Sequence, residues 1–104
     1  MKLRLQRNSV RLRLSPVEIT ELNKNGIISE TIIFNQFQTL IYTLKISDKT
    51  KVISVDFTDR ELVIEIPFDT ALNWTETNLT SLEYEQIIDQ KSTLKITIEK
   101  DFAQ

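Results

Sequence analysis

The chain opens with Met1-Lys2-Leu3-Arg4-Leu5-Gln6-Arg7-Asn8-Ser9-Val10-Arg11-Leu12-Arg13-Leu14, a segment in which cationic and aliphatic residues alternate and no acidic residue intervenes. Alternation at a period of two is typical of a β-strand with one buried and one exposed face. It places the leucines on one face and Lys2, Arg4, Arg11 and Arg13 on the other. The segment therefore predicts both a strip of the core and a row of positive charge.

The two alternating halves of this segment, Lys2–Gln6 and Val10–Leu14, carry their apolar residues at opposite parity. The three residues between them must therefore form a tight turn or a bulge. A turn centred on Asn8 and Ser9 places Arg4 opposite Arg13. A turn centred on Arg7 and Asn8 places Arg4 opposite Arg11. Either register sets like charges against each other, which destabilises the hairpin unless an anion or an acidic neighbour compensates.

A helix start follows directly after this hairpin. Ser15 can cap the helix, Pro16 suits its first position, and Glu18 completes a capping box. Gly26, the only glycine, can adopt the left-handed backbone conformation that caps the C-terminus of the helix. We therefore predict a helix over residues 16–24.

The rest of the chain is dominated by strand patterns separated by polar turns. Further strands are predicted at Ile28–Phe34, Leu40–Ile46, Val52–Phe57, Leu62–Ile66, Leu82–Ile88 and Thr93–Glu99, with a short helix over 68–74 after Pro67. The prediction is one α+β domain, residues 1–104, of about eight mostly antiparallel strands, barrel-like or sandwich-like. The element order suggests a ββαββ unit repeated twice, with the helices closing the ends.

Composition excludes many functions. The 104 residues include no cysteine and no histidine, so disulfides, zinc–thiolate sites, thiol nucleophiles and imidazole bases are excluded. A single glycine excludes a glycine-rich phosphate loop. No apolar run approaches the length of a membrane span, and no export signal is recognisable. We expect a cytoplasmic protein without a membrane segment or a cofactor.

The row formed by Lys2, Arg4, Arg11 and Arg13 has two interpretations. It can be an anion site for phosphates or nucleotides, since the planar guanidinium of arginine binds phosphate in a bidentate manner. Alternatively, it is an ion-pair ladder with acidic strands that fixes the register. The acidic residues considered for this ladder are Glu61, Glu65, Glu83 and Glu85. The acidic isoelectric point of about 5.1 disfavours a nucleic-acid binder.

Three further features are candidates for function. Glu83 and Glu85 share a strand face and could hold a divalent metal, particularly with Glu61 or Glu65 nearby. Trp74 and Phe37 are candidates for an interaction surface, although the interpretation favoured for Trp74 is that it packs over the end of the sheet as core. An uncovered edge strand could support a homodimer by strand addition.

The chain resembles a family of small uncharacterised bacterial proteins known only as a domain of unknown function. The resemblance rests mainly on Asn8-Ser9-Val10-Arg11-Leu12-Arg13-Leu14-Ser15 near the start and Ile98-Glu99-Lys100-Asp101-Phe102 near the end. It spans nearly the whole chain and implies a stand-alone, single-domain cytoplasmic protein of about this length. It implies no activity, substrate or catalytic residue.

Together these features favour a non-enzymatic interaction or accessory module that binds an unidentified protein partner. The alternative is a small anion-binding or phosphate-binding protein that uses the arginine row, with or without a divalent metal.

Overall fold

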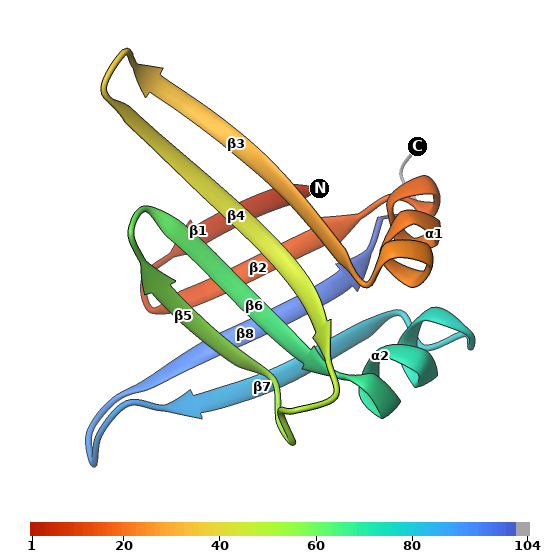
Figure 1. The fold of residues 1–104 in the computed structure, drawn as a ribbon. Coiled ribbons are helices and arrows are strands. Elements are labelled where there is room, and N and C mark those ends of the chain that lie inside the picture. The colour runs from red at the N-terminus through yellow and green to blue at the C-terminus, as the bar shows by residue number, and fades with distance from the viewer. Residues whose placement is uncertain (102–104) are drawn as a thin grey trace.

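A computed structural model of the chain describes residues 1–101, in which eight strands form two four-stranded sheets. The first sheet has the order β1-β2-β8-β7 and the second the order β3-β4-β6-β5 (Figure 1). The strands of the first sheet are β1 (Lys2–Gln6), β2 (Ser9–Leu14), β7 (Ser81–Ile87) and β8 (Thr93–Lys100). Those of the second are β3 (Ile27–Asn35), β4 (Gln38–Ser47), β5 (Ser54–Thr58) and β6 (Glu61–Pro67). The helices are α1 (Pro16–Asn25) and α2 (Phe68–Thr75).

The predicted ββαββ repeat is confirmed at the level of topology. The first repeat runs β1-β2-α1-β3-β4 and the second β5-β6-α2-β7-β8, and each contributes one antiparallel hairpin to each sheet. Within each sheet the two hairpins meet through a parallel pair, β2 with β8 and β4 with β6. The sheets are therefore mixed, and their parallel centres join segments far apart in the sequence.

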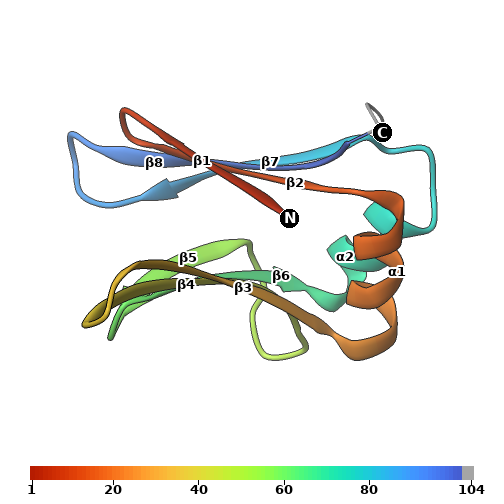
Figure 2. The ribbon, with the colours of Figure 1, turned by 90° about the horizontal axis from the view of Figure 1, so that it is seen from above.

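The two sheets stack face to face as a sandwich, not as a closed barrel (Figure 2). Both helices cover the same end of the sandwich, which corrects the expectation that they close its two ends. The reason is topological. Each helix carries the chain from one sheet to the other, and the strands that precede them, β2 and β6, finish at the same end (Figure 1).

Aliphatic side chains from both sheets form one core between the layers. Those with the least exposure are Leu12, Leu14, Leu22, Leu44, Ile64, Ile66, Ile96 and Ile98. Trp74 of α2 belongs to this core, because it is 0% exposed and its indole Nε1 donates to the carbonyl of Thr80 at 3.2 Å. Its place on an interaction surface is therefore wrong, and the alternative reading as core is correct.

Local sequence signals around α1 are confirmed. The hydroxyl of Ser15 accepts from the backbone N–H of Glu18, and a Glu18 carboxylate oxygen accepts from the N–H of Ser15 at 2.8 Å. Gly26 ends the helix at a left-handed φ of 77°. The strand predicted from Val52 instead begins at Ser54, because the carbonyl of Val52 accepts from the Thr50 hydroxyl within the preceding loop.

Candidate functional site

The first hairpin brings the predicted basic row together. Its turn is centred on Arg7 and Asn8, with Arg7 at a left-handed φ of 51°. Arg4 therefore lies directly opposite Arg11, which is one of the two predicted registers. Side chains opposite each other on antiparallel strands have Cβ atoms about 4.5–5.5 Å apart. Like charges consequently lie together along the outer face of β1 and β2.

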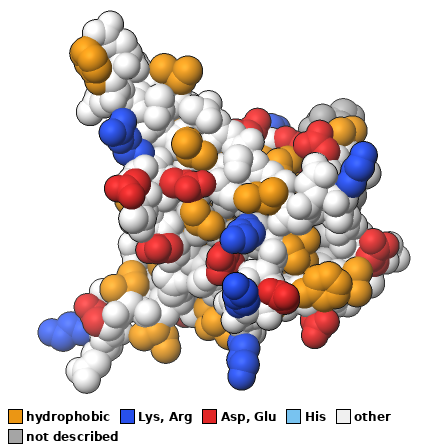
Figure 3. Space-filling model, viewed as in Figure 1, with side chains coloured by type: hydrophobic (Ala, Val, Ile, Leu, Met, Phe, Trp, Pro, Cys, Tyr) orange, Lys and Arg blue, Asp and Glu red, His pale blue; other side chains and the backbone are white. Residues whose placement is uncertain are grey.

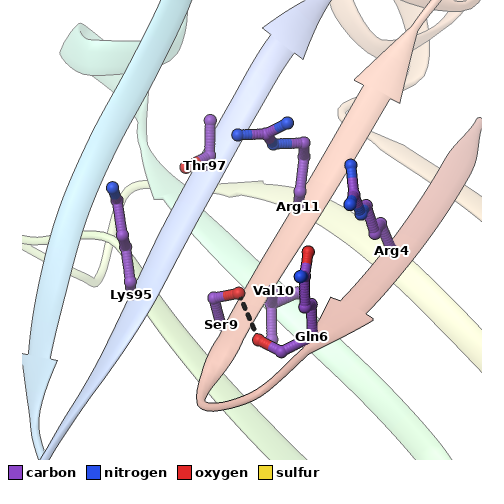
Figure 4. Close-up of a pocket in the computed structure, with 7 residues that line it drawn as sticks. All are labelled: Arg4, Gln6, Ser9, Val10, Arg11, Lys95 and Thr97. Carbon is purple, nitrogen blue, oxygen red and sulfur yellow. Dashed lines mark hydrogen bonds between the residues drawn. The ribbon is translucent and has the colours of Figure 1, made fainter.

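The parallel pairing of β2 with β8 adds a further cation to this face. The Asn8 amide donates to the carbonyl of Thr93 at 2.5 Å, and the Lys95 N–H donates to the carbonyl of Asn8 at 3.1 Å. These bonds align Ser9 with Lys95 and Arg11 with Thr97. The Lys95 side chain consequently projects from the same face as the arginines (Figure 4).

The cations at the helix end of this face are paired with acids. Lys2 Nζ contacts Asp101 at 3.0 Å. Arg13 Nε donates to the Glu99 carboxylate, and this hydrogen bond raises the pKa of the Arg13 guanidinium. Arg11 Nε lies 3.9 Å from the same carboxylate, which is too far for a hydrogen bond.

An ion-pair ladder therefore exists, but with other partners than those expected. Glu61 and Glu65 belong to β6 of the second sheet and cannot reach the row. Glu83 and Glu85 lie on β7, beyond β8, and form no ion pair with the row within residues 1–101. The acids that pair with it are Glu99 and Asp101, at the end of β8 and just after it.

The opposite end of the row is less compensated, since its only ion pair among the described residues is the 3.9 Å contact of Arg11 with Glu99. Arg4 forms no ion pair with any residue in the part of the chain that the structure describes. Together with Arg11 and Lys95 it lines a hollow of about 110 Å³ (Figure 4). Gln6, Ser9, Val10 and Thr97 complete its lining. A second hollow of about 150 Å³ adjoins it and shares Arg4 and Arg11.

The second repeat shows that these cations are not required by the strand pairing. Ser15 and Pro67 are the N-cap residues of α1 and α2, so counting back from them makes Arg11 equivalent to Val63. Through the hairpin registers, Arg4 is equivalent to Asp56. The same two positions thus carry two cations in the first sheet and none in the second.

The predicted metal site does not form as expected. Glu83 and Glu85 share the outer face of β7, but Glu61 and Glu65 lie on the other sheet. Residues 1–101 contain no group of three or more acidic, histidine or cysteine side chains that could hold a metal ion. Instead, Lys95 lies opposite Glu85 on the neighbouring strand.

The other predicted surface residue, Phe37, is 75% exposed at the turn between β3 and β4, so its position is compatible with an interaction surface. Sequence reasoning missed Lys95 and Glu99 as parts of the basic face. The alternation of Leu94, Ile96 and Ile98 indicates which way these two side chains point. It carries no information on which strand lies beside β8.

These features define a two-sheet α+β protein built from two ββαββ repeats, with a cationic hollow on the uncovered face of one sheet. The model of a family described as "Family of unknown function (DUF7009)" matches residues 1–103, and the chain belongs to this family. The predicted membership of an uncharacterised family is thereby confirmed, although Phe102 of its terminal motif lies outside the described residues. No curated protein and no solved structure matches the chain. No helix within residues 1–101 is long and apolar enough to cross a membrane.

Proposed function

We propose that this protein is a non-enzymatic binding module that recognises an oxyanion, a phosphate group in the first instance, through Arg4, Arg11 and Lys95. The observation that carries the proposal is the direct juxtaposition of Arg4 and Arg11 beside a hollow whose lining contains no carboxylate. Like charges placed opposite each other on paired strands are destabilising. A bound anion would remove this repulsion and accept hydrogen bonds from both guanidinium groups.

The size of the hollows favours recognition of a charged group over enclosure of a whole ligand. Their volumes, about 110 and 150 Å³, are small beside the roughly 300–1,000 Å³ of pockets that enclose small molecules. One phosphate would be held between Arg4 and Arg11, with the rest of the ligand lying across the open sheet face. This arrangement fits a module that docks onto a phosphorylated ligand and performs no chemistry on it. The cytoplasmic location and bacterial source stay predictions.

Removal of Arg4 and Arg11 is the direct test. We expect pyrophosphate to raise the melting temperature of the wild-type protein at low ionic strength, because a ligand that binds the native state stabilises it by mass action. The double variant Arg4→Gln/Arg11→Gln should lose this shift. The variant Lys49→Gln/Lys51→Gln removes two exposed cations from the loop between β4 and β5, so it matches the charge change and should keep the shift.

Parallel melts with inorganic phosphate, a nucleoside triphosphate and short single-stranded nucleic acid distinguish the sources of the phosphate. If none of them shifts the melting temperature, or if the double variant shifts as much as wild type, the proposal is wrong. Because surface electrostatics are screened by salt, the shift should also shrink as ionic strength rises.

Neutralising Glu99, the acid that competes with a bound anion, should strengthen anion binding. Glu99 pairs with Arg13 and lies 3.9 Å from Arg11 Nε, so its carboxylate opposes an incoming anion. We expect Glu99→Gln to bind pyrophosphate several-fold more tightly by isothermal titration, since about 1.4 kcal/mol corresponds to tenfold in affinity. Glu83→Gln, on the same sheet face but in no ion pair among the described residues, is the matched control and should change affinity less. Equal affinities for Glu99→Gln and wild type would count against an anion beside Arg11.

A further inference from the structure

Four edge strands are open to further pairing, and three of them are protected. β1 carries Lys2 and Arg4, and β7 carries Glu83 and Glu85, so self-association of either would bring like charges together. At β5 the side-chain amide of Gln86 bonds both backbone groups of Val55, accepting from its N–H at 2.8 Å and donating to its carbonyl at 3.1 Å. Gln86 thus occupies the place of a neighbouring strand at Val55 of β5.

The fourth edge, β3, is protected only over its first part. There Glu30 holds the amino group of Met1 at 2.9 Å. From Thr31 onward the strand is exposed at every residue. The chain carries no charged residue from Thr31 to Leu44, although charged residues make up 27% of its sequence. An edge strand that is long, apolar and uncharged is a template for pairing with another chain.

This unprotected part of β3 projects from the molecule. The β3–β4 hairpin extends beyond the neighbouring strands in Figure 1, and apolar side chains lie on either side of its end at the upper left of Figure 3. Ile33 and Phe34 of β3 are 73% and 65% exposed. With Phe37 at the turn, they are exposed apolar residues at the end of the hairpin, here called the β3 tip.

We propose that the β3 tip is a homodimer interface, in which residues 31–35 of two copies pair as antiparallel strands about a two-fold axis. Residues 31–35 of a second copy suit this edge, because they are uncharged and include Ile32, Ile33 and Phe34. Antiparallel pairing of identical segments is self-complementary and closes as a dimer. It would join the second sheets of the two copies into one continuous sheet and bring each Ile33 against its counterpart.

The contact involves only five residues of strand from each copy. Interfaces below about 1,200 Å² belong to the weak, reversible class. The dimer is therefore expected to form with rising protein concentration and to dissociate on dilution.

The test is the oligomeric state measured by sedimentation equilibrium over a wide concentration range. The wild-type protein should fit a reversible monomer–dimer equilibrium. Ile33→Lys should weaken association at least tenfold, because it places two ammonium groups opposite each other at the two-fold axis. Ile87→Lys is the matched control, since Ile87 is 79% exposed and occupies the equivalent position of β7 in the second repeat. It should associate as wild type does.

Hydrogen exchange at high and low protein concentration supplies a second readout. The amides of residues 31–35 should gain protection as concentration rises, whereas those of β7 should not. Three results would overturn the proposal: a monomer at every concentration, open-ended growth beyond a dimer, or equal weakening by Ile33→Lys and Ile87→Lys. Because both substituted side chains are largely exposed, circular dichroism should show the same fold for both variants.

Discussion

Trp74→Ala should lower the free energy of unfolding by about 3–5 kcal/mol, the usual cost of removing a large buried aromatic side chain. Trp74 is fully buried in the core at the helix-covered end of the sandwich. The substitution leaves a cavity and also removes the hydrogen bond from the indole to Thr80. Since domains of this size are stable by about 5–15 kcal/mol, the variant should lose a large part of its stability.

The measurement is urea unfolding followed by far-UV circular dichroism, because the substitution removes the only tryptophan fluorophore. Phe68→Ala is the matched control. Phe68 begins the same helix but is 55% exposed, so its removal should cost less than about 1 kcal/mol. If Trp74→Ala and Phe68→Ala were equally mild, the indole would not hold the helix layer to the sheets.

Features of the fold with local causes could be predicted from the sequence. Helix α1 is one example, because Ser15, Pro16, Glu18 and Gly26 specify its start and end within a dozen residues. The outward row of cations is another example, because alternation along a single strand determines which of its side chains point outward. These predictions depend on backbone geometry and capping, which the neighbouring residues determine.

Features that depend on distant pairing could not be predicted in the same way. The parallel pairing of β2 with β8 joins the beginning and the end of the chain, and no local pattern indicates it. Opposite charge alone made Glu61 and Glu65 reasonable partners for the arginines, yet the chain crossing through α1 and α2 places them on the other sheet. Glu99 is the observed partner because β8 lies beside β2.

The same crossing produces an ion cluster between the sheets that no sequence pattern indicated. The α-amino group of Met1 donates to the carboxylate of Glu18 on α1 and lies 2.9 Å from that of Glu30 on β3. The hydroxyl of Tyr42 on β4 lies 2.7 Å from the carbonyl oxygen of Met1 and 3.0 Å from a carboxylate oxygen of Glu30, and these two acceptors share its one proton. The cluster thus ties β1 of the first sheet to the second sheet and to the helix layer.

Three groups in this cluster, the Met1 amino group, Glu18 and Tyr42, have a shifted pKa. Burial alone would lower the pKa of the Met1 amino group, but its bonds to Glu18 and Glu30 outweigh burial and raise it above the ordinary 8.0. Burial alone would raise the pKa of Glu18, but its bonds to the Met1 ammonium and to Ser15 outweigh burial and lower it below 4.5. Burial, together with the neighbouring Glu30, raises the pKa of Tyr42 from 10.0 to about 12.

We expect these shifts to give a stability profile with a maximum between acid and mildly alkaline pH. The lowered pKa of Glu18 contributes stability that is present above pH 4.5 and lost as pH falls through the folded-state pKa. The raised pKa of Met1 contributes stability that is present below pH 8.0 and lost as pH rises through its folded-state pKa. Tyr42 adds a second alkaline loss, between pH 10.0 and about 12, because only the unfolded chain releases the tyrosine proton in that range.

Glu18→Gln isolates the acid limb of this profile. Glutamine can keep the capping box but removes the charge, so the free energy of unfolding at neutral pH should fall by about 1.5–3 kcal/mol, the range for a hydrogen bond to a charged group. Its profile should also be flatter between neutral pH and the acid limit, as measured by urea unfolding at a series of pH values. Glu21→Gln, an exposed substitution on the same helix, is the control and should retain the wild-type profile. Only Glu18→Gln removes the Met1–Glu18 ion pair. If both variants lost stability at acid pH to the same extent, this pair would not be the source of the acid sensitivity.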